Sequence, residues 1–458
     1  MFATATPTTP LSSAPPRATA TSATVVSTTP FALPYLKEQG SIVKFNNGHT
    51  LIFVPRQGDV FNVSTWVKTG SLHEDAQNNG VSHFLEHLMF KGSDRFAPGV
   101  FDRAMESMGG VINAATWKDY TFYYITGPNT AYGEFATALD MHADMLLHST
   151  LPEDEIGPAY DPDKGETPSV KRERGVVIEE IGMCEDRPWT KVYNAVNEMM
   201  YPAGHPYRRE VIGTRHIVGT IPREQILAYY RRWYAPQTMT TVVVGNFELE
   251  SLTQQVAEAF NFGAITNTAE ALKVYTEPPA DAHWASLPTP TVERYQELQG
   301  DYDTRFVIKS WHGPKLEDKK AGLALSVASH ILGESRSSRL HLNLVEKQTP
   351  SKFTTLGTTQ YAFKLGIVFF VQGNFIASDV PAALAEIDAE LAAVLGDAPI
   401  TQAEFDRTVK KLKTDFARSV ETSAGLADNL GESYTLTDDV AFFTSTLDEL
   451  KELTLADV

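Results

Sequence analysis

The stretch Val81-Ser-His-Phe-Leu-Glu-His-Leu-Met-Phe90 places two histidines and a glutamate inside one short apolar run. On a helix that turns by roughly 100° per residue, His87 lies about 40° around the axis from His83, and Glu86 lies about 60° to the other side. The three side chains therefore share one helix face. Two imidazoles one turn apart can bind the same metal ion, and a carboxylate beside them can take a proton from a water molecule. The order is His-x-x-Glu-His, the inverse of His-Glu-x-x-His.

A second acidic motif lies downstream, in Lys171-Arg-Glu-Arg-Gly-Val-Val-Ile-Glu-Glu180. Glu173 and Glu180 are seven residues apart, so they also share a face if the segment is helical. A histidine on an apolar helix face is more often a packed core residue than a ligand, and this second motif is what favours a metal site. Structural zinc sites usually use four protein ligands and catalytic sites three, so two histidines plus one carboxylate fit the catalytic pattern.

These motifs resemble those of the pitrilysin-type (M16) inverzincin zinc metallopeptidases, and most closely the branch that contains mitochondrial processing peptidase and its bacterial relatives. The resemblance extends from Ile42 to about Gly263. The matching motifs are His83-Phe-Leu-Glu-His-Leu-Met-Phe-Lys-Gly92, Asn113-Ala-Ala-Thr116, Asp119-Tyr-Thr-Phe-Tyr-Tyr124, Glu173-Arg-Gly-Val-Val-Ile-Glu-Glu180 and His205-Pro-Tyr207.

The resemblance implies a zinc metalloendopeptidase, a hydrolase of peptide bonds. It assigns Zn²⁺ binding to His83, His87 and Glu180, the general base to Glu86, and a supporting role just outside the ligands to Glu173. In the family a peptide substrate adds as an extra strand to an edge strand, and Asn113 and Ala114 match its contact positions. An edge strand binds extended peptides through main-chain hydrogen bonds. The alternative is an ordinary sheet edge.

The length of 458 residues with 42% hydrophobic content predicts two domains, because single cores stop growing beyond roughly 250 to 300 residues. We expect an α+β fold of two homologous α/β sandwich-like domains, each a mostly antiparallel sheet packed against helices. The expected divisions are a disordered N-terminal tail (1–34), a zinc-bearing peptidase domain (35–263), a linker (264–292) and a degenerate second repeat domain (293–458). Local patterns predict a strand over Val111 to Thr126 and a helix from about Ser169 to Asp186.

The second half resembles a degenerate repeat of the first half. Ser326-Val-Ala-Ser-His330 falls where the His-x-x-Glu-His motif falls in the first half, with serines in place of the first histidine and the glutamate. This half therefore cannot build the same metal site. Leu453 to Val458 resembles the approach to a first-half helix at Arg223, which predicts a second domain truncated at its C-terminus. Either the sequence is a fragment, or that domain needs a neighbour.

Active relatives also carry a substrate-gripping arginine and tyrosine in the second half. At the corresponding positions this sequence has Val345 and Phe353. We therefore expect a same-fold partner subunit that supplies the arginine and the tyrosine.

The formal net charge of -18 argues against nucleic acid and anionic membrane surfaces as partners and favours basic peptides. The acidity could equally serve solubility alone. No stretch reaches the roughly 18 to 20 apolar residues of a membrane span, so we expect a soluble protein without a membrane span. The single cysteine, Cys184, excludes an intrachain disulfide.

The N-terminal segment is rich in Ala, Thr, Ser and Pro and lacks acidic residues. This composition fits an organelle transit peptide or a plain disordered tail equally well. The expected compartment is cytoplasmic in a bacterium, or the mitochondrial or plastid interior if the tail is a transit peptide.

Two functions follow as hypotheses. The first is a zinc-dependent endopeptidase that hydrolyses extended or unfolded peptides as the catalytic subunit of a heteromer. The second is a non-catalytic assembly or core subunit of the same fold. The presence of all five site residues, His83, Glu86, His87, Glu173 and Glu180, favours the first.

Overall fold

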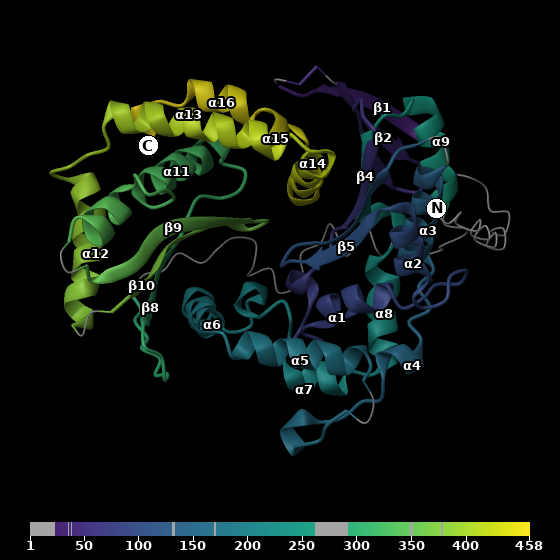
Figure 1. Ribbon diagram of the computed structural model, residues 1–458, viewed down its shortest axis with the longest axis horizontal. Coiled ribbons are helices and arrows are strands. Elements are labelled where there is room, and N and C mark those ends of the chain that lie inside the picture. Colours follow the sequence, from purple (N-terminus) through teal and green to yellow (C-terminus); the bar gives the residue numbers. More distant parts are fainter. Residues whose placement is uncertain are drawn as a thin grey trace, which may run out of the picture.

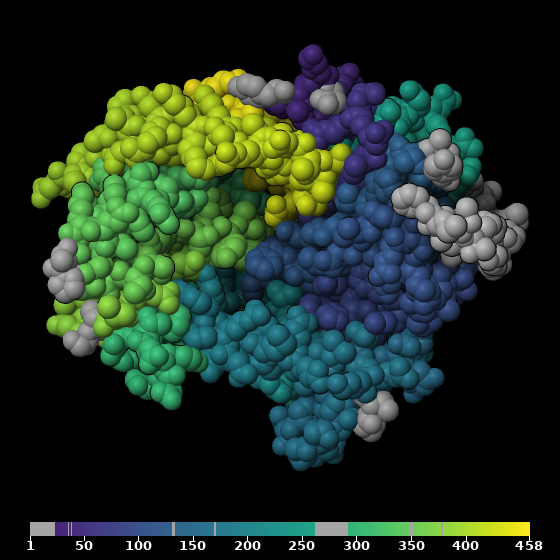
Figure 2. Space-filling model, viewed as in Figure 1, coloured from purple at the N-terminus to yellow at the C-terminus, as the bar shows by residue number. Residues whose placement is uncertain are grey.

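The computed structural model describes residues 23–34, 36–37, 39–130, 133–168, 171–261, 292–348, 351–376 and 379–458. Two halves face one another, each with a sheet backed by helices (Figure 1). The surface is hollowed where the two halves meet (Figure 2). The expected α+β class with two homologous, mostly antiparallel halves is confirmed.

The first half is built on a seven-stranded sheet of order β1-β2-β3-β7-β4-β6-β5. Its strands are β1 (Val25–Ala32), β2 (Gln39–Phe45), β3 (Thr50–Pro55), β4 (Val60–Val67), β5 (Val111–Thr116), β6 (Thr121–Pro128) and β7 (Met239–Gly245). Among the described strands of this sheet, only β3 and β7 pair in parallel. Strand β7 is buried at every position, as expected for a central strand covered on both faces.

The helices of the first half carry the candidate site residues. They are α1 (Val81–Met89), α2 (Val100–Met108), α3 (Glu134–Leu147), α4 (Glu153–Ile156), α5 (Glu173–Glu185), α6 (Pro188–Met200), α7 (Arg215–Thr220), α8 (Arg223–Trp233) and α9 (Leu249–Ala259), with short turns η1 (Ser71–His73), η2 (Pro162–Lys164), η3 (Pro206–Arg208) and η4 (Pro236–Thr238). Helices α1, α3, α8 and α9 pack on one face of the sheet and form the largest core cluster with it. This core fixes the position of α1.

The second half repeats part of this arrangement. Its sheet has the order β8-β10-β9, from β8 (Arg305–His312), β9 (Phe353–Phe363) and β10 (Gly366–Phe375). The order matches β4-β6-β5, and α11 follows β8 as α1 follows β4. The remaining elements are α11 (Lys319–Leu332), the π-helix η6 (His341–Glu346), α12 (Val380–Leu395), α13 (Gln402–Ser419), α14 (Ser423–Thr437), α15 (Ala441–Thr444), α16 (Thr446–Glu452) and η7 (Leu455–Asp457).

Each half contributes one helix to the sheet of the other. Helix α14 packs on the face of the first sheet opposite α1, with Leu430 and Tyr434 in one cluster with Trp66. Helix α6 packs on the second sheet, where Val196 joins a cluster with Phe370. The two halves are therefore joined by apolar cores in both directions, and the positions of α14 and α6 can be followed in Figure 1.

Two local expectations differ from the structure. The segment Val25–Ala32, expected within a disordered tail, forms β1 and pairs along β2, because main-chain hydrogen bonds in a sheet do not depend on side-chain burial. The expected single strand over Val111 to Thr126 is a hairpin, β5 and β6, closed by the N–H of Trp117 donating to the carbonyl of Tyr120 at 2.8 Å. The expected linker lies outside the described residues except for Val292.

In the described part of the chain, no helix combines the length and the hydropathy that a membrane span requires.

Candidate metal centre

Helix α1 turns its apolar side to the core and its polar side outward. Val81, Phe84, Leu85 and Leu88 are buried on the sheet side. His83, Glu86 and His87 are each half-buried on the remaining face, as the helical spacing predicted.

The N-terminus of α1 is held by a buried carboxylate. Glu74 accepts hydrogen bonds from the backbone N–H groups of Gly80 at 2.7 Å and Ser82 at 2.8 Å, and from Asn79 Nδ2 at 2.8 Å. A carboxylate at a helix N-terminus satisfies otherwise unpaired N–H groups and complements the helix dipole. Glu74 therefore fixes where the helix begins, and the sequence pattern gave no sign of this role.

Helix α5 brings Glu180 to the same place. Glu180 Oε2 lies 3.7 Å from His83 Nε2 and 3.4 Å from His87 Nε2. The three possible ligand atoms lie within 4.8 Å of one another. A tetrahedral zinc ion with bonds of about 2.0 to 2.2 Å separates its ligand atoms by about 3.4 Å. The three donors therefore suit a zinc ion and leave a fourth position for another ligand.

The protonation state of His83 suits a ligand. Burial, and then the proximity of His87, lowers the pKa of His83 to about 4. The imidazole is neutral at pH 7, so its lone pair is available.

Glu173 lies beside this group without joining it. Its Oε2 lies 3.3 Å from His87 Nδ1, and its Oε1 pairs with Lys91 Nζ at 2.8 Å. Burial alone would raise the pKa of Glu173, but the contacts with His87 and Lys91 outweigh it and lower the pKa. Burial lowers the pKa of His87, yet the Glu173 contact and the nearby carboxylates raise it overall. An ionised Glu173 at Nδ1 orients the ring so that Nε2 faces Glu180.

Lys91→Met should weaken zinc binding about tenfold, the low end of the range for groups that orient metal ligands, because Glu173 would lose the charge that fixes it. Competition with a fluorescent zinc chelator measures the affinity. Lys91→Arg keeps the positive charge and should retain most of it. Equal zinc affinity in Lys91→Met and the unchanged chain would show that Glu173 needs no such support.

Glu86 and the edge strand lie next to each other. Thr116 Oγ1, at the end of β5, donates to Glu86 Oε2 at 2.6 Å. Burial raises the pKa of Glu86, and the contacts from Thr116 partly offset this. Asn113 and Ala114 lie on β5, which pairs only with β6 among the described residues. Thr116 belongs to a motif that the sequence analysis noted, but its contact with Glu86 depends on tertiary packing.

The second half holds no comparable group among its described residues. Ser329 Oγ donates to Glu334 Oε1 at 2.5 Å, and His330 Nε2 pairs with Glu334 at 3.1 Å. Phe353 is 1% exposed and belongs to the core of this half, with Val345 packed against that core. These two positions therefore serve packing.

A further group, Asp161, Asp163 and His216, lies at the surface of the first half. His216 Nδ1 lies 3.0 Å from Asp163 Oδ2, and Lys164 pairs with Asp161 at 3.0 Å. Lys164 and His216 already occupy these carboxylates, so the group is explained as a network of polar contacts at the surface.

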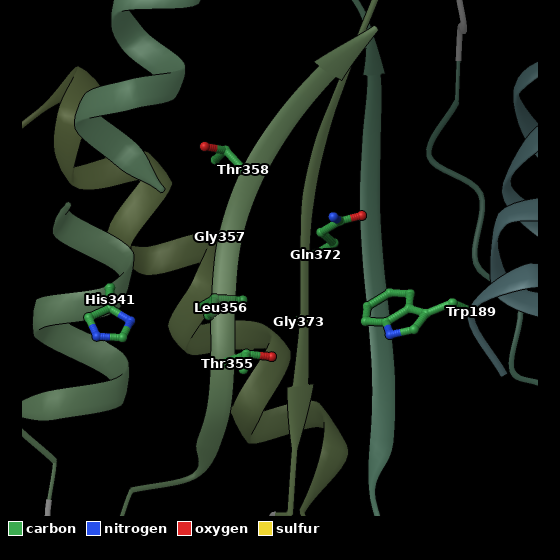
Figure 3. A pocket seen from close by; sticks show the side chains of 8 residues that line it. All are labelled: Trp189, His341, Thr355, Leu356, Gly357, Thr358, Gln372 and Gly373. Carbon is green, nitrogen blue, oxygen red and sulfur yellow. The ribbon is translucent and has the colours of Figure 1, made fainter. Parts of the chain in front are cut away.

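A cavity of about 280 Å³ is lined by residues of the second half together with Trp189 of the first half. The backbone of Gly357 and Gly373 lies between the side chains of Trp189, from α6, and His341, from the π-helix (Figure 3). No candidate site residue lines it, so it is separate from the metal centre.

Comparison with known proteins identifies the family. A family model described as insulinase (peptidase family M16) matches residues 55–215, and one described as the peptidase M16 inactive domain matches residues 220–412. The chain belongs to peptidase family M16. The inactive-domain match includes the part of the second half in which serines replace metal-site residues.

Relatives of this M16 chain include named zinc proteases. Zinc protease PqqE of Helicobacter pylori is 26% identical over 435 residues, 93% of this chain and 90% of the relative. The mitochondrial-processing peptidase subunit beta of Dictyostelium discoideum is 28% identical over 229 residues, 49% of this chain and 45% of that protein. A crystal structure of a protease from Helicobacter pylori superposes with a TM-score of 0.75 at 25% identity, covering 93% of this chain and 95% of the other.

Proposed function

We propose that this M16 chain is a zinc-dependent metalloendopeptidase that hydrolyses extended or unfolded peptides. His83, His87 and Glu180 would hold the zinc ion, and Glu86 would be the general base. The observation that carries the proposal is the approach of two imidazole Nε2 atoms to one Glu180 oxygen, at 3.7 and 3.4 Å, on the helix face that presents Glu86.

A bound zinc ion supplies Lewis acidity, which lowers the pKa of water and polarises a carbonyl. Glu86 takes a proton from the attacking water and returns it to the leaving amine. Burial raises the pKa of Glu86. The shift brings this pKa closer to neutral pH, where the same carboxyl group must first accept a proton and then release it. Glu173 keeps the His87 ring oriented through the contact at Nδ1.

The peptide would bind along β5 as an added strand, with Asn113 and Ala114 in contact with it. Main-chain hydrogen bonds hold any extended peptide in this way and leave the side chains to determine preference. The position of β5 at the end of the strand order supports this role. The formal net charge of -18 favours basic peptides among the substrates.

We further propose that a same-fold partner subunit completes the site with an arginine and a tyrosine. Val345 and Phe353 cannot donate side-chain hydrogen bonds to a substrate or a developing oxyanion, and both contribute to the core of the second half. Loss of one such donor typically costs about 10²- to 10³-fold in rate. The relative from Dictyostelium is itself named as a subunit. A non-catalytic assembly subunit is the second candidate, favoured by these same two positions.

The test is cleavage of a quenched, unstructured basic peptide by the purified chain, with and without a zinc chelator, alone and mixed with a same-fold partner. We expect chelator-sensitive cleavage that is strongest in the mixture, because the partner would supply the missing donors. Full activity of the chain alone would contradict the proposal that a partner subunit is needed. Absence of cleavage under every condition, with zinc bound, would favour the assembly subunit.

A further inference from the structure

We propose that Thr116 is a positioning residue for Glu86 and that its hydroxyl ties the general base to the strand on which the peptide binds. The inference deepens the proposed function and rests on it. It assigns a role to the last residue of the motif Asn113-Ala-Ala-Thr116.

The contact joins two different elements. Thr116 Oγ1 donates to Glu86 Oε2 at 2.6 Å, across the packing of β5 against α1. A hydroxyl donating to a carboxylate is among the shorter and stronger hydrogen bonds in proteins. Glu86 is long and only half-buried, so without this bond several rotamers would be open to it. The Thr116 hydroxyl therefore selects one of them.

Thr116 is itself held firmly by the hairpin. It pairs with Thr121 across β5 and β6. Thr121 is fully buried, and its Oγ1 donates to the carbonyl of Thr69 at 2.9 Å. The next residue, Trp117, closes the hairpin onto Tyr120. The sheet thus fixes the backbone of Thr116, and the hydroxyl transmits that position to the carboxylate.

The contact between Thr116 and Glu86 matters because Thr116 lies on the strand along which the peptide would bind. A peptide added to β5 takes its register from the backbone of Asn113 and its neighbours, and Thr116 is three residues further along the same strand. The base and the scissile bond are then located by one strand. Misplacement of a catalytic group by about 1 Å can lower the rate about 10²-fold. Positioning the base and the peptide by the same strand should therefore increase the rate.

The electrostatics agree with this geometry. A hydrogen bond donated to a carboxylate favours its charged form, and Thr116 Oγ1 makes such a bond to Glu86 Oε2 at 2.6 Å. The hydroxyl therefore stabilises the ionised carboxylate, which is the form that accepts a proton.

The experiment compares Thr116→Val with Thr116→Ser. Valine has nearly the shape of threonine without the donor, and serine keeps the donor. Thr137→Val is the matched control, because Thr137 is exposed on α3 and its hydroxyl only bonds the carbonyl of Gly133. For each variant we would measure kcat, KM, zinc affinity, Tm, and peptide affinity of the metal-free chain by fluorescence anisotropy.

We expect Thr116→Val to lower kcat about 10- to 100-fold, up to the cost of misplacing a catalytic group by about 1 Å. KM, peptide affinity and zinc affinity should change little, since a peptide added to β5 is held by main-chain hydrogen bonds and the Thr116 hydroxyl bonds Glu86, which is not one of the three possible metal ligands. Thr116→Ser should recover most of kcat. If valine lowers Tm enough to unfold the hairpin, Thr116→Ala takes its place in the same comparison.

The inference is overturned if Thr116→Val keeps kcat, if serine is as impaired as valine, or if the loss follows zinc or peptide affinity instead. A wild-type chain without chelator-sensitive cleavage, alone or with a partner, would instead refute the proposed function, and the role of Thr116 with it. The two failures are therefore distinguishable in one series.

Discussion

Glu86→Gln is expected to bind zinc as the unchanged chain does and to lose peptide cleavage. Glutamine preserves the shape of the side chain and its contact with Thr116, but it cannot take a proton at neutral pH. General acid–base catalysis contributes about 10²- to 10⁴-fold, and the loss should reach at least that size because the same group serves both proton transfers. Zinc content by mass spectrometry and cleavage of the quenched peptide are the two measurements.

Two substitutions on α5 control this result. Glu180→Gln should lose zinc and activity together, because it weakens a metal ligand. Glu179 is exposed and belongs to neither group of possible metal ligands, so Glu179→Gln should keep both. Residual cleavage near the wild-type rate in Glu86→Gln would remove Glu86 from the mechanism. Loss of zinc in that variant would make it a structural residue of the metal centre.

Arg174→Leu should destabilise the first half by at least about 3 kcal/mol. Arg174 is 3% exposed and donates to the carbonyls of Val218 at 2.6 Å, Ile221 at 3.0 Å and Gly157 at 3.3 Å. Each buried carbonyl left without a donor costs about 1 to 3 kcal/mol. Burial lowers the pKa of Arg174 to about 10, so the guanidinium remains charged at neutral pH and the full set of bonds is present.

Urea unfolding followed by circular dichroism measures this free energy. Arg172→Leu, two residues earlier on an exposed position, should have little effect. Arg174→Lys should fall between, because one ammonium cannot reach all of the carbonyls that the planar guanidinium joins. A change below 1 kcal/mol for Arg174→Leu would mean that water satisfies these carbonyls. Because Arg174 adjoins Glu173, the destabilised chain should also bind zinc less tightly.

Local sequence carried much of the candidate site. The angular spacing of His83, Glu86 and His87 follows from helix geometry alone, so one short motif predicted that they share a face. The same holds for Glu173 and Glu180 on α5. The structure brings the two helix faces together, with Glu180 Oε2 3.4 Å from His87 Nε2. Periodicity cannot predict this approach, and only the family resemblance suggested it.

The groups that support the site were beyond the reach of periodicity. Glu74 caps α1 from a preceding loop, Lys91 pairs with Glu173 from the turn that follows α1, and Thr116 reaches Glu86 from a strand. Each contact joins segments whose separation in sequence carries no fixed geometry. The sequence does not announce the turn at Trp117 to Tyr120, because Trp117 and Tyr120 favour strands and the two residues between them, Lys118 and Asp119, include no Gly, Pro or Asn.

The sequence by itself determined the fold class, the family and the side chains able to bind a metal, because helical and strand periods and short motifs are local properties of the chain. The tertiary structure alone decided that α14 covers the first sheet and α6 the second, that β1 is an ordered edge strand, and that Thr116 meets Glu86. The sequence of an amphipathic helix shows that one face must be buried, but it does not show which sheet that face packs against. Likewise, the sequence shows that a threonine hydroxyl can donate a hydrogen bond, but the acceptor depends on which side chain the folded structure places beside it.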